Sequence, residues 1–291
     1  MRAIVTPLDG SRLAEESLRA ACATARRVGA VLHMVLVHHP IAPNADSAAM
    51  ATAIDEIDRL AREGEEQYLA QVAERMRLEY GIHVETKILD GPVAETLGAY
   101  VTRLGAGLVV MTTHGRGAVS RFWLGSVADH LLRHLDVPLL LLRHKEEPVH
   151  DSRMAFRRML IALDGSERAE AVLEPALALC PPPTAEIALL RVVAPEANGA
   201  AQGRGAAAVY LDEVADRLER RGCRVSTTVV VSDSPAQAIL DQARPEATDC
   251  VAIATRGALG VKRLMLGSVT DKVVRGSEVP VLALHPPLGE G

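Results

Sequence analysis

The stretch GRGAVSRFWLGSVADHLLRHLDVPLLLL, residues 115–142, returns as GALGVKRLMLGSVTDKVVRGSEVPVLAL at residues 257–284. The two segments align without a gap, and 13 of the 28 aligned positions are identical. Earlier in the chain, VTPLDGS at residues 5–11 has a counterpart in LIALDGS at residues 160–166. Two ordered pairs of this kind indicate that one structural unit occurs twice. The difference in residue number between matching positions is 155 for the earlier pair and 142 for the later pair. The second copy is therefore 13 residues shorter in its middle, near residues 195–206.

Each copy reads as five short apolar strands separated by helical segments. In the first copy we expect strands at residues 3–8, 31–37, 83–88, 108–111 and 138–142. We expect helices, from apolar residues spaced three or four apart, at residues 14–28, 51–80 and 127–134, and another after the turn at 90–92. Continuous apolar runs are typical of strands that are buried on both faces. The alternation therefore predicts a mostly parallel sheet with right-handed crossovers and helices on both faces.

These elements predict an α/β fold of two tandem Rossmann-like domains, residues 1–145 and 155–286. Each domain is expected to form its own five-stranded, mostly parallel sheet flanked by helices, and the two domains should superpose. The polar stretch 144–152 is the predicted linker. The fifth strands, 137–142 and 279–284, are candidate unprotected edges, which pairing of the halves as an internal pseudo-dimer would cover. A homodimer of the whole chain stays open.

The composition excludes several classes of protein. The chain has 291 residues with a formal net charge of −5, so it lacks the basic excess that is usual for nucleic-acid binding. The longest apolar run, 137–142, is far shorter than the ~20 residues of a membrane-spanning helix. Pro7 and Asp9 interrupt the first apolar stretch before it could form the core of a secretion signal. We therefore expect a cytoplasmic protein with no membrane partner.

The cysteines indicate neither a zinc site nor a disulfide framework. No two of them are spaced as C-x-x-C; the four are Cys22, Cys180, Cys223 and Cys250. Small, buried, reduced thiols are the expected state. Three histidines near the predicted strand ends, His38, His39 and His114, also fit no metal-ligand spacing.

The first candidate loop follows the first strand of each copy. It reads Asp-Gly-Ser in both, at residues 9–11 and 164–166. Ligands of open α/β sheets bind outside the carboxyl ends of the strands, where this loop is expected. One interpretation is a strand-to-helix turn in which Asp or Ser caps the helix. The other places the carboxylates of Asp9 and Asp164 near a Mg²⁺ ion that bridges phosphates, and the two interpretations are compatible.

The second candidate loop follows the fourth strand of each copy. Its spacing is the same in both: four residues, then nine, then Gly-Ser-Val. The first copy has Thr112-Thr113-His114-Gly115 and Gly125-Ser126-Val127. The second copy has Ala254-Thr255-Arg256-Gly257 and Gly267-Ser268-Val269.

This pattern suits an anion such as phosphate. Glycines allow backbone N–H groups to approach oxygens closely, and they adopt backbone angles that a valine would exclude. Ser126 and Ser268 are expected to open a helix, whose N-terminus favours negative charge. The alternative is two turns with an N-cap serine. The repetition at equal spacing favours the anion site.

The two loops together resemble those of the universal stress protein family, and the resemblance covers nearly the whole chain twice. Nucleotide-binding members of that family show G-x-x-G, nine residues, then G-[ST]. They also place an Asp at the end of the first strand and a Val after the second. In this sequence Asp9 and Val37 match those positions in the first half, and Asp164 and Val192 match them in the second.

The resemblance implies a site for ATP, ADP or AMP with Mg²⁺ in each half. The Val37 and Val192 backbones would read the adenine edge, and the glycines and serines would hold ribose and phosphates. The implied residues of the first half are Pro7, Asp9, Val37, Thr112, Gly115, Gly125, Ser126 and Val127. Those of the second half are Ala162, Asp164, Val192, Ala254, Gly257, Gly267, Ser268 and Val269. Thr112 and Ala254 replace the first Gly of the pattern, and a Cβ there crowds the approach to ribose or phosphate.

No constellation of nucleophile and base accompanies these loops. The sequence has neither a G-x-S-x-G elbow nor a G-x-x-x-x-G-K-[ST] loop. The leading hypothesis is a non-catalytic nucleotide-binding sensor or regulator of the stress response, which presents its surface to an unidentified protein partner. The alternatives are a slow Mg²⁺-dependent ATPase and an interaction scaffold without nucleotide.

Overall fold

The structure, a computed structural model, describes residues 1–40, 48–113, 124–143, 156–195, 200–244, 246–255 and 267–286. The predicted linker at residues 144–152 lies outside these ranges. In the first half the elements are β1 (Ala3–Leu8), α1 (Arg12–Val28), β2 (Val31–His38), α2 (Ala48–Tyr80), β3 (Val84–Asp90), α3 (Val93–Leu104), β4 (Leu108–Thr112), α4 (Ser126–His134) and β5 (Leu139–Leu142). In the second half they are β6 (Arg158–Ala162), α5 (Glu167–Glu170), α6 (Leu173–Leu179), β7 (Glu186–Val193), α7 (Ala200–Glu219), β8 (Arg224–Val231), α8 (Pro235–Gln242), β9 (Cys250–Ala254), α9 (Ser268–Gly276) and β10 (Val281–Leu284).

The strands of both halves follow the same order. In the first half β3, β2, β1, β4 and β5 lie side by side and parallel. In the second half β8, β7, β6, β9 and β10 repeat that arrangement. The predicted class, two tandem Rossmann-like α/β units with mostly parallel sheets, is therefore confirmed.

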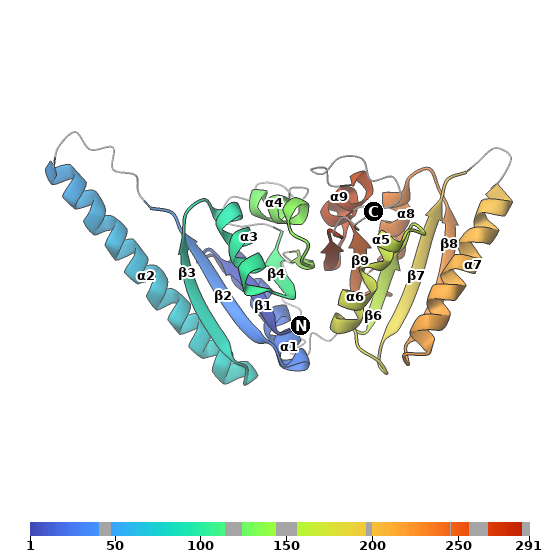
Figure 1. The fold of residues 1–291 in the computed structure, drawn as a ribbon, viewed down its shortest axis with the longest axis horizontal. Coiled ribbons are helices and arrows are strands. Elements are labelled where there is room, and N and C mark those ends of the chain that lie inside the picture. Colours follow the sequence, from blue (N-terminus) through green and yellow to red (C-terminus); the bar gives the residue numbers. More distant parts are fainter. Residues whose placement is uncertain are drawn as a thin grey trace.

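The two sheets are not separate, and that expectation is wrong. β5 and β10 pair antiparallel, with Leu140 opposite Leu282, so all ten strands form one sheet (Figure 1). Each fifth strand is an apolar edge whose unpaired N–H and C=O groups would otherwise face solvent. Pairing the two edges satisfies these groups, as an internal pseudo-dimer requires. Arg143 adds a hydrogen bond across the junction, from Nη1 to the Ser277 carbonyl at 2.9 Å.

Helices cover both faces of the ten-stranded sheet, and each face has a core that continues through both halves. Side chains of α1, α2, α6 and α7 build one core. Side chains of α3, α4, α8 and α9 build the other. Leu140 and Leu142 of β5 enter the first core, and Leu139 and Leu141 enter the second. A run of four leucines fits this strand because both of its faces are buried.

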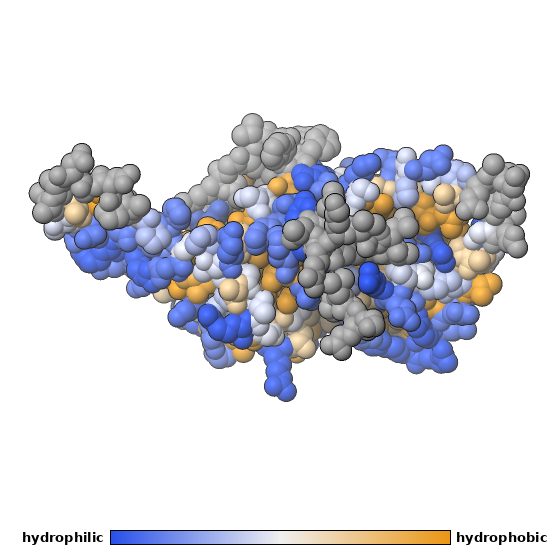
Figure 2. All heavy atoms as spheres, turned by 45° about the horizontal axis from the view of Figure 1, so that its top comes forward, coloured by the Kyte–Doolittle hydropathy of each residue, from blue (hydrophilic) through white to orange (hydrophobic). Residues whose placement is uncertain are grey.

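The halves differ most in the helix after their second strand. α2 has 33 residues and α7 has 20, so the shorter middle of the second copy is largely a shorter helix. α2 projects beyond the end of the sheet (Figure 1). Its projecting part, at the left in Figure 2, is mostly hydrophilic, with exposed apolar side chains at Met50, Ile57 and Leu60.

The first helix of the second half is broken, which the repeat did not predict. α1 is continuous, whereas its counterpart is divided into α5 and α6. Pro175 lies within α6. A proline cannot donate to the carbonyl four residues earlier, here that of Ala171, and its ring collides with that carbonyl. The break between Glu170 and Leu173 therefore follows from one residue.

Candidate functional site

The Asp-Gly-Ser loops form tight turns at the carboxyl ends of β1 and β6. In the first half the Ser11 N–H donates to Asp9 Oδ1 at 2.9 Å, and Ser11 Oγ accepts from the Ala14 N–H at 3.1 Å. Gly10 between them has a φ of +79°, a left-handed angle that favours glycine. The interpretation of this loop as a capped turn is confirmed.

The second copy repeats the turn. The Ser166 N–H and Oγ both donate to Asp164 Oδ1, at 3.0 and 2.6 Å. Ser166 Oγ accepts from the Ala169 N–H at 3.2 Å, and Gly165 has a φ of +90°. Each turn holds an Asp carboxylate in a fixed orientation at the strand ends. A carboxylate so placed offers the oxygen ligand that Mg²⁺ prefers.

The glycine loops close on the strand that precedes them. The Gly125 N–H donates to the Thr113 carbonyl at 2.8 Å, and the Gly267 N–H donates to the Thr255 carbonyl at 3.1 Å. Both glycines have φ near −60°, an angle that any residue adopts. The expectation that special backbone angles require glycine here is wrong. The requirement is space, because an added Cβ would lie 3.1 Å from the Thr113 oxygen and 2.6 Å from that of Thr255.

Gly125 and Gly267, and not the serines, are the N-caps of α4 and α9. The alternative of an N-cap serine is therefore wrong. Ser126 and Ser268 are the first helical residues, and both are exposed. The first N–H groups of a helix have no partner within it, so an exposed hydroxyl among them gives a set of donors suited to an anion.

The remaining expected residues lie at the same edge of the sheet. Thr112 and Ala254 are buried at the last positions of β4 and β9. The others are partly or fully buried near the ends of their elements: Pro7, Val37, Val127, Ala162, Val192 and Val269. Val37, Val127, Val192 and Val269 pack against the core that α3, α4, α8 and α9 share. Gly115 and Gly257 lie outside the described residues.

Arg191 was missed by the reading of the sequence. A Cβ on Gly165 would lie 2.7 Å from Arg191 Cζ, so the guanidinium lies directly beside the Asp-Gly-Ser turn. The same guanidinium lies 5.0 Å from the centre of the Tyr210 ring on α7. The signal was an Arg within the apolar run IALLRVV. Its counterpart in the first half is the buried Leu36.

His38 was considered only as a metal ligand, but the structure assigns it another role. It is 3% exposed at the end of β2 and contacts two carboxylates of α2. The imidazole lies 2.8 Å from Glu65 Oε2 and 3.2 Å from Asp58 Oδ1. Burial acts to lower the pKa of His38, but hydrogen bonds and charges from Glu65 and Asp58 outweigh it and raise that pKa. These two contacts of His38 therefore hold α2 against the end of β2.

The cysteines are structural. All four are buried and unpaired, as predicted. Burial raises the pKa of the Cys22 thiol to about 12 and that of Cys180 to about 11. A thiol with such a pKa is not a nucleophile at neutral pH. In the part of the chain that the structure describes, no helix is long and apolar enough to cross a membrane.

Comparison with known proteins assigns both halves to one family. Residues 1–143 and 155–285 each match the model of the universal stress protein family. A universal stress protein of Mycolicibacterium smegmatis is 26% identical over 265 residues, 88% of this chain and 85% of that protein. Universal stress protein YxiE of Bacillus subtilis is 28% identical over 147 residues, 45% of this chain and 99% of its own length. The crystal structure of a universal stress protein from Archaeoglobus fulgidus has a TM-score of 0.73 at 21% identity, with 99% of this chain and 97% of that chain covered; this likeness shows the fold.

Proposed function

This chain belongs to the universal stress protein family, and on that premise we propose that each half binds one adenine nucleotide at the carboxyl ends of its strands. The observation that carries the proposal is the pair of glycine-capped helices, α4 and α9. They begin at the ends of β4 and β9, the strands next to β1 and β6, which lead into the Asp-Gly-Ser turns. The positive end of the helix dipole and the N–H groups of the first turn stabilise a phosphate at such a place.

Each chemical part of the nucleotide has a candidate partner. Ser126 and Ser268 donate to phosphate oxygens, together with the first N–H groups of α4 and α9. Asp9 and Asp164 hold the Mg²⁺ that accompanies ATP, directly or through water. The backbones of Val37 and Val192 bind the adenine edge. The remaining residues proposed for the two sites are Pro7, Thr112, Gly115, Gly125 and Val127 in the first half, and Ala162, Ala254, Gly257, Gly267 and Val269 in the second.

The proposed role is that of a non-catalytic sensor, in which nucleotide occupancy changes the surface offered to a protein partner. The Asp-Gly-Ser turns orient a carboxylate through serine and backbone donors, which suits binding and not proton transfer. A slow Mg²⁺-dependent ATPase is the alternative, because Asp9 or Asp164 would bring the metal to the phosphates. A homodimer would need another surface, because β5 already pairs with β10.

The decisive experiment is to denature the purified protein and identify released ATP, ADP or AMP, then to titrate stripped protein with ATP. We expect two equivalents per chain and weaker binding when EDTA removes Mg²⁺. Phosphate release no faster than that of a glycine-loop variant would support the sensor over the ATPase. A folded chain that neither carries nor binds nucleotide would overturn the proposal and favour the nucleotide-free scaffold.

A further inference from the structure

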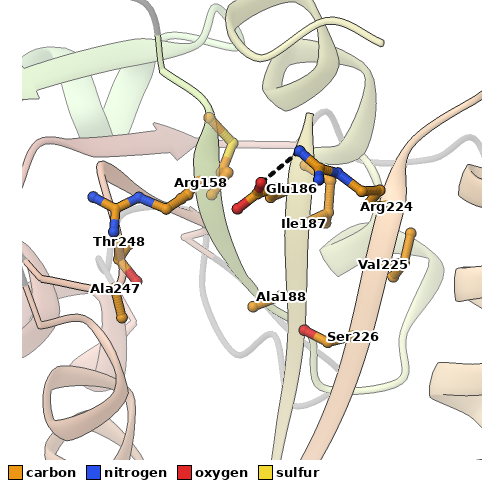
Figure 3. Close-up of a pocket in the computed structure, with 10 residues that line it drawn as sticks. Arg158, Glu186, Ile187, Ala188, Arg224, Val225, Ser226, Ala247 and Thr248 are labelled. Carbon is orange, nitrogen blue, oxygen red and sulfur yellow. Dashed lines mark hydrogen bonds and ion pairs between the residues drawn. The ribbon is translucent and has the colours of Figure 1, made fainter. Parts of the chain in front are cut away.

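A cavity of about 290 Å³ lies at the amino ends of β6, β7 and β8, at the opposite edge of the sheet from the proposed nucleotide site. Figure 3 shows Glu186 and Arg224 joined across the starts of β7 and β8, with Ala188 and Ser226 farther along these strands. Ala247 and Thr248, which follow α8, form the other side. Different side chains occupy the corresponding place in the first half.

In the first half the same place is filled by two rings. His33, buried on β2, is hydrogen-bonded through Nδ1 to the Tyr100 hydroxyl at 3.1 Å. The two rings meet edge to face, with centres 6.3 Å apart. Arg103 lies 5.9 Å from the centre of the Tyr100 ring, and Glu85 lies 3.5 Å from His33. The first half thus holds a phenol ring between an imidazole and a guanidinium.

The second half has lost both rings. Ala188 is the counterpart of His33 and Ser226 that of Glu85, because the pair Ala188–Ser226 repeats the register of His33–Glu85. The counterpart of Tyr100 is Gln242, which is exposed at the end of α8. α3 continues for four residues beyond Tyr100, whereas α8 stops at Gln242. Two small side chains and a shorter helix therefore leave the cavity.

The lining retains the chemistry that a phenol needs. The Ala188 methyl provides an apolar floor, and the Ser226 hydroxyl and Glu186 carboxylate can bond a phenolic hydroxyl. Arg224, 2.5 Å from Glu186, can offer its guanidinium to a ring face as Arg103 does in the first half. Arg158, also at the cavity, is held by Asp249 at 2.7 Å. Both guanidinium groups of the lining are paired with carboxylates, Arg158 with Asp249 and Arg224 with Glu186, so their charge is already balanced, which favours a neutral phenol over an aromatic acid.

We propose that this cavity is a second ligand site, which binds small monocyclic phenols in the place that Tyr100 occupies in the first half. The site is independent of the proposed nucleotide site and would let a second class of small molecule act on the same chain. A ligand of eight heavy atoms in a partly open cavity is expected to bind with a Kd on the order of 1 mM.

The probe is 4-methylphenol, which has the structure of a tyrosine side chain. We expect it to shift the amide NMR signals of Ala188 and Ser226 in a saturable way. Ala188→Phe fills the cavity with a ring that has no hydrogen-bonding group, and should weaken binding at least tenfold. Thr228→Phe, a similar change on β8 outside the lining, should leave the affinity unchanged. Cyclohexanol, which has no ring face for Arg224, should bind several-fold more weakly.

A reciprocal variant tests the same idea in the first half. His33→Ala with Tyr100→Ala should open a matching cavity and raise the stoichiometry from one 4-methylphenol to two, provided circular dichroism shows a folded chain. The proposal is overturned if the amides of Ala188 and Ser226 do not respond, or if Ala188→Phe binds as tightly as the wild type. Equal affinity for cyclohexanol would overturn the assignment to phenols.

Discussion

The two halves share one strand order but place different charges at the carboxyl ends of their strands. The second half has Arg191 beside Gly165, where the first half has the buried Leu36. The first half has His38 between two carboxylates of α2, where the second half has the partly buried Val193. The turn and the glycine-capped helix are present in both. The duplicated fold thus supplies the same backbone donors twice, and single substitutions set the charges near the strand ends of each copy.

This difference predicts that the two halves differ in their affinity for ATP and in their response to pH. A guanidinium beside the Asp164 turn adds positive charge near the place proposed for phosphates, so the second half should bind ATP more tightly. The ion pairs of His38 attach a long helix to the first half, so that half should respond more to pH. The predictions below test this comparison, from the largest expected effect to the smallest.

The largest effect is expected from separating the halves. Residues 1–143 expressed alone would leave the β5 edge, a run of four leucines, without its β10 partner. We expect this fragment to dimerise by pairing two β5 edges, because an exposed apolar edge is a template for strand addition. Sedimentation equilibrium of the fragment and of the full chain measures the outcome. A fragment that stays folded and monomeric would show that β5 does not need a partner.

The next effect concerns the two glycines. Replacing Gly125 or Gly267 by Val should abolish nucleotide binding in its own half, because the new side chain would lie where the backbone N–H groups must approach the phosphate. Each lost charge-assisted hydrogen bond to phosphate costs about 1.5–3 kcal/mol, roughly ten- to a hundredfold in affinity. The new Cβ would also meet a carbonyl oxygen at 3.1 Å in the first half but at 2.6 Å in the second. Gly267→Val should therefore cost more stability, on the order of 1–3 kcal/mol.

Calorimetric titration and denaturant unfolding of both variants measure these two effects. Ser126→Ala and Ser268→Ala are the matched controls, and they should cost less affinity because the helix N-terminus persists. If both folded Val variants bind ATP as well as the wild type, the phosphates do not lie at these helices. If only one variant matters, Thr112 or Ala254 blocks the other half.

The repeat and the alternation of strands and helices were readable from the sequence because they depend on local pattern. Short runs such as that of β5 are apolar on both faces, and only a sheet covered on both sides tolerates that. The break in the first helix of the second half also has a local cause, Pro175. Predicting it requires knowing that this proline lies within the helix. The joining of the two sheets does not follow from local pattern, because it depends on which edge strands meet in space, here β5 and β10.

The sequence named the residues of the candidate site, but its reason for the two glycines was wrong. The pattern located Gly125 and Gly267, yet assigned them special backbone angles that neither glycine adopts. Their real constraint, the nearby carbonyl of Thr113 or Thr255, joins residues more than ten positions apart. Arg191 escaped because its contact with Gly165 joins a strand to a turn that lies far away in sequence. Side-chain contacts of this kind require the fold.

A smaller effect is expected from Arg191. Arg191→Leu gives the second half the residue of the first, and should weaken ATP binding in the second half about three- to tenfold at low salt while leaving the first half unchanged. The loss should shrink at high salt, because screening weakens the attraction between charges. Calorimetry at two ionic strengths measures this, with the exposed Arg220→Leu on the same half as control. Equal affinities for wild type and variant at low salt would remove Arg191 from the site.

The smallest effect is a pH dependence of stability that belongs to the first half. Because the pKa of His38 is raised in the folded chain above its ordinary value of 6.5, the protonated imidazole stabilises the fold. That contribution is complete below the unfolded pKa and is lost as the pH rises through the folded one. His38→Val, which copies Val193, should therefore destabilise the chain most at pH 5 and least at pH 9. We expect the difference between these two pH values to be on the order of 1 kcal/mol, since the partner carboxylates are partly exposed. Thermal unfolding of wild type and variant at both pH values measures it, and His39→Val at the neighbouring exposed histidine is the control. A destabilisation that is the same at pH 5 and pH 9 would mean that His38 stabilises the strand end by packing alone.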